Sequence, residues 1–323
     1  ESGMIDSEDL LARFLSYVQL DTRSDPHSQT TPSTAKQWVL VRQLEQELKA
    51  LGIEDVKVTE YGYVLATVPA TTGKKGVPRV ALLAHLDTAQ GCSGLAKPIV
   101  HRNYQGQPIV LPNAPDQVLT VENAAGLKDK IGQDVITAAG DSLLGADDKA
   151  GVAAIMAAVR HLVGHPDIRH GTVRICFNPD EEIGRGSEKI SLEDLAADVA
   201  YTFDADDVAV VDFETFSADK AVLKIHGVPA HPGWAKGLMV NAIRLGAKFI
   251  DALPKEASPE QTADRDGFIH PEEMRGGPAD VEIMMLLRDF EIEGLAQKRK
   301  VIEDIIARLK AEEPRARFEL EIT

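Results

Sequence analysis

The stretch VALLAHLD, residues 80–87, decides the fold. Its first five residues form a continuous apolar run, which is typical of a strand buried on both faces of a sheet. His85 and Asp87 follow this run at positions i and i+2, so both side chains leave the strand end on one side. A buried strand that ends in such residues indicates an α/β protein with its chemistry at the carboxyl ends of the strands.

Working outward from this stretch, helical and strand patterns alternate along the first two thirds of the chain. Apolar spacing and turn residues predict, in chain order, helices over 7–20 and 34–51, strands over 56–59 and 63–68, the strand over 80–84, an excursion over 91–139, a helix over 149–163, and buried strands over 173–177 and 199–203. This alternation predicts a sheet with helices on both faces.

The pattern changes beyond residue 216. There the sequence predicts strands over 221–225, 279–288 and 317–322, helices over 238–253 and 295–309, and a loop rich in Pro, Glu and Asp between residues 253 and 279. A chain of 323 residues is long for one hydrophobic core. We therefore expect a catalytic α/β domain over residues 1–215 and a smaller α+β lid domain over residues 216–323.

Composition narrows the classes of partner. Hydrophobic residues make up 44% of the chain and the net charge is −16, from 35 basic and 51 acidic residues. Such a charge repels nucleic acid and anionic lipid, and no apolar run approaches the roughly 20 residues that span a bilayer. The first residues lack the pattern of a signal peptide, and the two cysteines form no framework. We expect a cytoplasmic protein with no nucleic-acid or membrane partner.

Acidic residues gather near the ends of the predicted strands. Asp147 and Asp148 open a small-residue helix, residues 180–182 place three carboxylates in one turn, and Asp204 follows the strand over residues 199–203. Each acid alone is explained by a helix cap or a solvated surface. Together with His85 they favour a metal site, because a carboxylate can bridge two cations and clustered like charges are costly without them.

Long motifs in this sequence resemble the peptidase T family of tripeptide aminopeptidases, within the co-catalytic dinuclear-zinc exopeptidases. The motifs are HLDT from residue 85, LLGADDKAG from residue 143, PDEEIG from residue 179, YTFD from residue 201 and HPGWAKGLMVNA from residue 231. The resemblance runs from the first predicted helix nearly to Thr323.

The resemblance implies a site with two Zn²⁺ ions. His85 and Asp204 would bind one zinc, Glu182 would bind the other, and Asp147 would bridge the two. Glu181 would be the general base, and Asp87 would orient His85. In the smaller domain, His231 would contact the substrate or stabilise the developing oxyanion, and Asn241 and Arg288 would bind the terminal carboxylate of the substrate.

One departure from the family pattern concerns the end of the chain. The family closes its site with a late histidine after a Gly-Gly-Thr-Asp-Gly turn, whereas no histidine follows His270 here. We therefore expect that the last part of the catalytic domain lies outside this chain, and that this chain by itself is inactive.

The implied function is hydrolysis of the N-terminal peptide bond of short peptides, with tripeptides as the expected substrates, by a protein that can form a homodimer through its lid domain. Two alternatives stay open. One is a dipeptidase or N-acyl amino acid amidohydrolase, which would share the metal set. The other is a non-catalytic, metal-dependent peptide-binding module, against which the presence of Glu181 argues, because binding alone needs no base.

Overall fold

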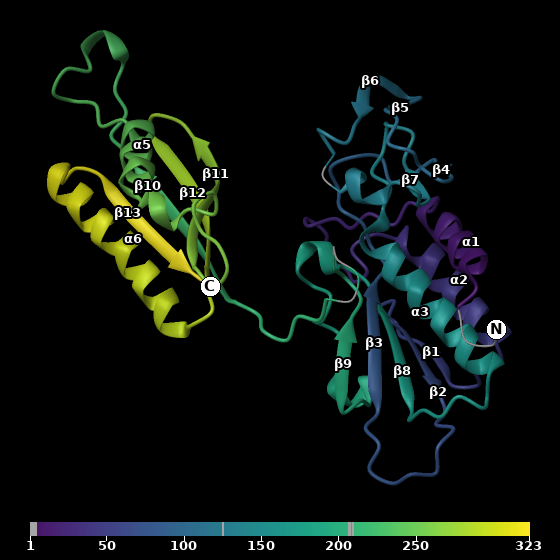
Figure 1. Cartoon of the computed structure of the whole chain (residues 1–323). Coiled ribbons are helices and arrows are strands. Elements are labelled where there is room, and N and C mark those ends of the chain that lie inside the picture. The colour runs from purple at the N-terminus through teal and green to yellow at the C-terminus, as the bar shows by residue number, and fades with distance from the viewer. Residues whose placement is uncertain (1–4, 125, 206–207, 209) are drawn as a thin grey trace. The chain divides into compact units, whose positions relative to one another are not determined.

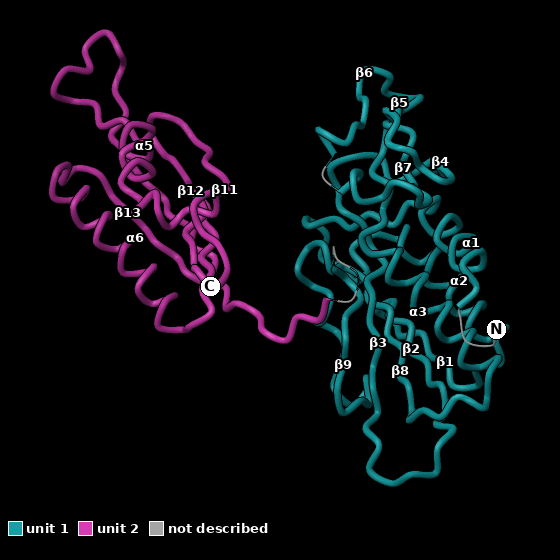
Figure 2. The backbone as a smooth tube through the Cα atoms, viewed as in Figure 1, with its two compact units in different colours: residues 1–208 teal, residues 209–323 magenta. Residues whose placement is uncertain are grey.

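The structure is a computed structural model that describes residues 5–124, 126–205, 208 and 210–323. It divides into two compact units, residues 1–208 and residues 209–323 (Figure 2). Each unit has its own hydrophobic core.

The first unit is built on a five-stranded mixed sheet. Its elements are α1 (Ser7–Val18), α2 (Gln37–Ala50), β1 (Val56–Val58), β2 (Val64–Val68), β3 (Val80–His85), β4 (Ile99–His101), β5 (Ile109–Leu111), β6 (Ala114–Leu119), β7 (Val135–Thr137), α3 (Ala146–Gly164), β8 (Val173–Asn178), α4 (Leu192–Leu195) and β9 (Val199–Thr202). The main sheet has the order β1-β2-β8-β3-β9. Strands β8, β3 and β9 run parallel, whereas β1 and β2 are antiparallel to their neighbours.

Long helices cover one face of this sheet (Figure 1). Apolar side chains of β2, β3 and β8 pack there against α1, α2 and α3 in one core. The opposite face carries a smaller cluster of Tyr63, Leu65 and Cys176, which packs against Ile190 and against Leu195 of α4. The expected α/β class is confirmed, but the three long helices gather on one face, and the other face is covered mainly by an irregular segment.

Strand β9 differs from its prediction as a buried strand. It lies at the edge of the sheet, and Val199 and Tyr201 are 45% and 50% exposed. The prediction was wrong because an apolar β-pattern does not distinguish a central strand from an edge strand. Strand β9 still pairs in parallel with β3, with Leu83 opposite Thr202. The residues that follow β9 therefore lie at the same end of the sheet as His85.

The excursion between β3 and α3 forms small structures of its own. Strands β4 and β7 make one two-stranded sheet, and β5 and β6 make another. Tyr104, Ile109, Leu111 and Leu127 form a satellite core beside them.

The second unit is an antiparallel sheet with two helices. Its elements are β10 (Ser217–His226), α5 (Ala242–Ala252), β11 (Phe268–Gly276), β12 (Asp280–Asp289), α6 (Ile292–Glu312) and β13 (Arg317–Ile322), and the sheet order is β11-β12-β10-β13. Apolar residues of α5 and α6 pack on this sheet.

Strand β11 lies where the sequence predicted a loop. It is an edge strand that contains Pro271 and two glutamates, with a register irregularity between Pro271 and Glu273. Proline is tolerated at such an edge, where an N–H group is not needed for the ladder, so the composition resembled that of a loop.

Among the described residues, no helix combines the length and the apolar character that crossing a bilayer requires.

Candidate metal centre

The parallel strands bring the predicted site residues of the first unit to one end of the sheet, where the carboxyl ends of β3, β8 and β9 lie. His85 is the last residue of β3 and pairs with Asn178, the last residue of β8. Asp87 follows β3, the turn of residues 180–184 follows β8, and Asp204 follows β9. Asp147, at the start of α3, lies at the same end of the sheet, where its carboxylate contacts His85.

The His85 imidazole is the centre of the cluster. It is only 2% exposed, and its Nε2 lies 2.8 Å from Asp147 Oδ1. The same nitrogen lies 3.7 Å from Glu181 Oε2 and 3.7 Å from Asp204 Oδ2. Three carboxylates from three different chain segments therefore converge on one ring nitrogen.

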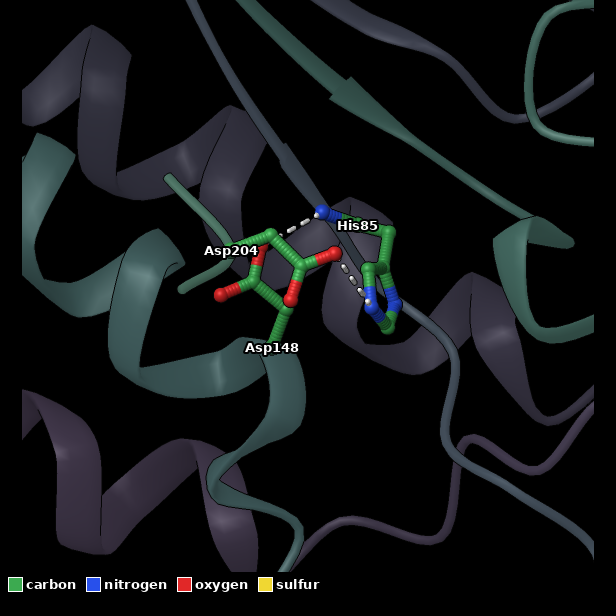
Figure 3. Close-up of side chains that lie close together, drawn as sticks. All are labelled: His85, Asp148 and Asp204. Atoms are coloured by element: carbon green, nitrogen blue, oxygen red, sulfur yellow. Dashed lines mark hydrogen bonds and ion pairs between the residues drawn. The ribbon is translucent and has the colours of Figure 1, made fainter. Parts of the chain in front are cut away.

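Asp147 and Asp148 are adjacent in sequence but have different environments. Both have non-helical backbone dihedrals at the start of α3. The Asp147 side chain is 71% exposed, whereas Asp148 is 3% exposed. The Asp148 carboxylate accepts hydrogen bonds from the backbone N–H groups of His85 (3.2 Å) and Gly151 (3.1 Å). Figure 3 shows Asp148 and Asp204 turned toward His85, one beside its backbone nitrogen and one beside its ring.

Asp87 contacts both His85 and the acidic turn. Its backbone carbonyl oxygen lies 3.0 Å from His85 Nδ1, and its Oδ1 lies 3.5 Å from the same nitrogen. Its carboxylate also accepts hydrogen bonds from the N–H groups of Glu181 (2.9 Å) and Glu182 (3.1 Å). The sequence predicted the contact with His85 but gave no sign of the bonds to the turn.

Burial and like charges shift the pKa values of the cluster. Burial by itself would lower the pKa of His85, but the hydrogen bond to Asp87 and the charges of Asp87, Asp148 and Glu181 raise it to about 10. Burial raises the pKa of Asp148 to about 8, against the opposing charge of His85 and with a contribution from Asp204. Burial also raises the pKa values of Glu181 and Glu182. Clustered carboxylates with raised pKa values around a histidine are typical of sites that bind a cation.

The described residues include two groups whose ligand atoms lie within 4.8 Å of one another. One group is His85, Asp148 and Asp204, and the other is His85, Asp147 and Glu182. Each group offers one imidazole nitrogen and two carboxylates, a donor set that suits zinc and other divalent metals. Asp148 was not among the predicted ligands, although the adjacent acids of the ADDKAG motif could have suggested it.

The predicted substrate residues all belong to the second unit. His231 Nδ1 accepts a hydrogen bond from the N–H of Gly233 (3.0 Å), and its ring stacks on Trp234 at a centroid distance of 4.5 Å. Asn241 caps α5 by accepting from the N–H groups of residues 243 and 244. Arg288 Nη1 donates to the carbonyl oxygen of residue 287 (2.9 Å), and its guanidinium lies 5.6 Å from the centroid of the Phe216 ring.

Comparison with known proteins extends over both units. Residues 213–317 match the model of the peptidase dimerisation domain. Peptidase T of Geobacillus sp. (strain WCH70) is 41% identical over 315 residues, which are 97% of this chain and 77% of that protein. Peptidase T of Shewanella halifaxensis is 42% identical over 94% of this chain and 74% of its own length.

Solved structures show the same fold. The aminopeptidase PepT from Bacillus cereus aligns with a TM-score of 0.72 at 23% identity, over 99% of this chain and 76% of that chain. A dinuclear metal-binding peptidase of the M20 family from Bacillus subtilis aligns with a TM-score of 0.56 at 16% identity, over 98% of this chain and 74% of that chain. On the sequence identity and coverage of its relatives, this chain belongs to the peptidase T family.

Proposed function

We propose that the protein is a zinc-dependent aminopeptidase that removes the N-terminal residue of short peptides, with tripeptides as its main substrates. The observation that carries this proposal is the convergence of Asp147, Glu181 and Asp204 on His85 Nε2 in a member of the peptidase T family. Three carboxylates around one buried imidazole nitrogen are favourable when divalent cations neutralise them.

We assign His85 and Asp204 to one zinc ion, Glu182 to a second, and Asp147 to both. The exposed Asp147 carboxylate supports the bridging role, because its Oδ1 lies beside His85 Nε2 and its group of ligand atoms includes Glu182. Asp148 suits that role less well, since its carboxylate is buried and accepts two backbone N–H groups. Two zinc ions bound here would activate a water molecule and polarise the scissile carbonyl.

Glu181 is the proposed general base. Its side chain is 51% exposed and its Oε2 lies at the edge of the cluster, 3.7 Å from His85 Nε2, so it can reach a water molecule there. Burial raises its pKa, which makes the carboxylate a stronger base near neutral pH. In this role Glu181 accepts the proton of the attacking water and passes it to the leaving amine.

The second unit supplies the proposed substrate contacts. Because His231 Nδ1 accepts the Gly233 N–H, the neutral ring carries its proton on Nε2, which is then able to donate to a substrate oxygen. Asn241 uses its side-chain oxygen as a helix cap, which leaves its nitrogen as the donor to a peptide carboxylate. Arg288 would bind the same carboxylate with its guanidinium fork.

We also propose a cytoplasmic protein that forms a homodimer through the second unit. The match of residues 213–317 to a dimerisation domain supports the dimer. The two cysteines, Cys92 and Cys176, are both free, which suits a reducing compartment.

A panel of peptides tests the function. We expect the zinc-loaded, full-length protein to release the first residue of a tripeptide such as Ala-Ala-Ala, and to lose this activity with a chelator. Blocking the N-terminus by acetylation should abolish cleavage. Preference for N-acyl amino acids or dipeptides would favour the amidohydrolase or dipeptidase alternative, and peptide binding without turnover would favour the binding module.

Arg288→Lys tests recognition of the peptide carboxylate in the same assay. We expect KM to rise much more for peptides with a free carboxylate than for amidated ones, because Lys cannot form a bidentate pair. Arg308→Lys, at an exposed position of α6, is the matched control. Equal effects of Arg288→Lys on both peptides would remove Arg288 from this role.

A further inference from the structure

The residue before the proposed base Glu181 carries a buried carboxylate. Asp180 directly precedes Glu181 and is 0% exposed. Its backbone has a left-handed conformation with φ 59°, which is uncommon outside glycine and which aspartate tolerates better than most residues. The function proposed above gives this side chain no role.

The Asp180 carboxylate is hydrogen-bonded to a segment far away in the sequence. It accepts from the N–H of Ser33 at 2.8 Å and also from the Ser33 hydroxyl, 147 residues away. It further accepts from Gln37 Nε2 at 2.7 Å, in the first turn of α2. These donors compensate the burial of the carboxylate, and hydrogen bonds to a charged acceptor are about twice as strong as neutral ones.

Arg185 forms a second set of hydrogen bonds between the turn and the residues that precede α2. The Arg185 guanidinium donates to the carbonyl oxygens of Ser28 (3.0 Å) and Thr30 (3.1 Å) and to the Thr31 hydroxyl (2.8 Å). The Arg185 N–H also donates to the Asp180 carbonyl oxygen at 2.9 Å, which closes the turn. The turn of residues 180–184 is therefore bonded, through Asp180 at its start and Arg185 just after its end, to the residues before α2 and in its first turn.

Asp87 holds the middle of this turn by accepting the N–H groups of Glu181 and Glu182. The start of the turn is therefore bonded through Asp180 to Ser33 and Gln37, and the backbone of Glu181 itself is bonded to Asp87. A catalytic group must be held within about 0.5 Å of its productive position, and a misplacement of about 1 Å can reduce the rate about 100-fold.

We propose that Asp180 is a positioning residue for Glu181. It contacts neither the substrate nor the reacting atoms, and it acts through the backbone of the turn. The bonds to Ser33 and Gln37 fix the start of the turn and thereby the direction of the Glu181 side chain. This inference rests on the role of Glu181 as general base in the proposed function.

A graded series of variants of the full-length protein tests the proposal. Asp180→Ala removes every acceptor, Asp180→Asn puts an amide nitrogen where one oxygen faces a donor, and Ser33→Ala removes only the hydroxyl donor. We expect kcat to fall about 100-fold for Asp180→Ala and less for the other two variants, with KM nearly unchanged. Bound zinc should stay the same. Asp9→Asn, a partly buried carboxylate that pairs with Arg13 and Arg160, is the matched control.

Two further measurements separate positioning from general destabilisation. In the Glu181→Ala background, Asp180→Ala should reduce the residual rate no further, because its effect passes through Glu181. Hydrogen exchange of the backbone amides of residues 181–185 should become at least about 10-fold faster in Asp180→Ala and stay unchanged in Asp9→Asn.

Different outcomes overturn different claims. If the wild-type protein releases no amino acid from any peptide, the proposed function fails and the positioning role fails with it. If the wild type is active and folded Asp180→Ala or Asp180→Asn keeps the wild-type kcat, only the positioning role fails. The same holds if the losses from Asp180→Ala and Glu181→Ala multiply.

Discussion

At the scale of single residues, His85 is the centre of the acidic cluster in the first unit. Asp147, Glu181 and Asp204 surround its Nε2, and Asp87 contacts its Nδ1. Burial by itself would lower the pKa of His85, but the hydrogen bond to Asp87 and the charges of Asp87, Asp148 and Glu181 raise it to about 10. A metal ion bound as proposed would compete with the ring proton for Nε2.

We predict that zinc binding releases protons at pH 7, because His85 is protonated in the metal-free cluster and must be neutral to bind. Zinc affinity should rise with pH up to about 10. Since the folded pKa lies above the usual 6.5, the contribution of His85 to the stability of the metal-free protein is fully present below pH 6.5 and is lost as the pH rises through about 10. Calorimetric titration in buffers with different ionisation enthalpies measures the released protons. A binding enthalpy that is the same in every buffer would contradict this prediction.

The adjacent residues Glu181 and Glu182 should respond differently to removal. Glu181→Ala should keep its zinc and lose roughly 10² to 10⁴ in kcat, because it removes a base and no ligand. Glu182→Ala should lose one zinc ion. Metal analysis and initial rates on the same samples decide between the roles, with Glu193→Ala, at an exposed position of α4, as the control. If Glu181→Ala instead loses zinc and keeps activity, the two assignments are reversed.

At the scale of elements, the ends of strands and helices place the functional groups. The carboxyl ends of β3, β8 and β9 lie side by side at one end of the sheet, because these strands are parallel. In the second unit, the N-terminus of α5 determines the orientation of Asn241, whose side chain accepts from two N–H groups of the first turn. One side chain therefore has a structural bond and a proposed substrate contact.

Substitutions of Asn241 separate these two roles. Asn241→Ala should destabilise the second unit by about 1 kcal/mol, because the helix loses its cap, whereas Asn241→Asp keeps a capping oxygen and should be nearly as stable as the wild type. Both variants lack the amide donor, so both should raise KM for peptides with a free carboxylate. Thermal unfolding and kinetics measure the two effects. An Asn241→Asp protein with unchanged KM would leave Asn241 as a cap alone.

At the scale of the whole molecule, the chain consists of two units with separate cores. Residues 1–208 and 209–323 each have a cluster of buried apolar side chains, and the two clusters have no residue in common. Ile155 of α3 belongs to one cluster and Ile283 of β12 to the other, and both are 0% exposed.

We predict two calorimetric unfolding transitions. Ile155→Ala and Ile283→Ala should each destabilise one unit by about 2–5 kcal/mol through a cavity, and should leave the transition of the other unit unchanged. Differential scanning calorimetry of the two variants measures this. A single transition that both variants lower equally would show that the units unfold as one cooperative body.

The sequence by itself determined the class of fold, and it predicted the types of ligand. Apolar runs that end in His85 or in acidic residues predicted the strands, and the periodicity beyond residue 216 predicted the second domain. These patterns are local, because each depends on residues that are neighbours along one strand or helix. For the same reason they were wrong for the two edge strands β9 and β11. Strand β9 is exposed where a buried strand was predicted, and β11 accommodates proline and glutamates that resembled a loop.

Only the tertiary structure decided which groups contact one another. It separated exposed Asp147 from buried Asp148, brought the carboxylate of Asp87 to the turn of residues 180–184, and joined Asp180 to Ser33 and Gln37. These contacts link residues 62 to 147 positions apart. They depend on the register of the sheet and on the packing of α2 and α3 against it, which no local pattern in the sequence contains.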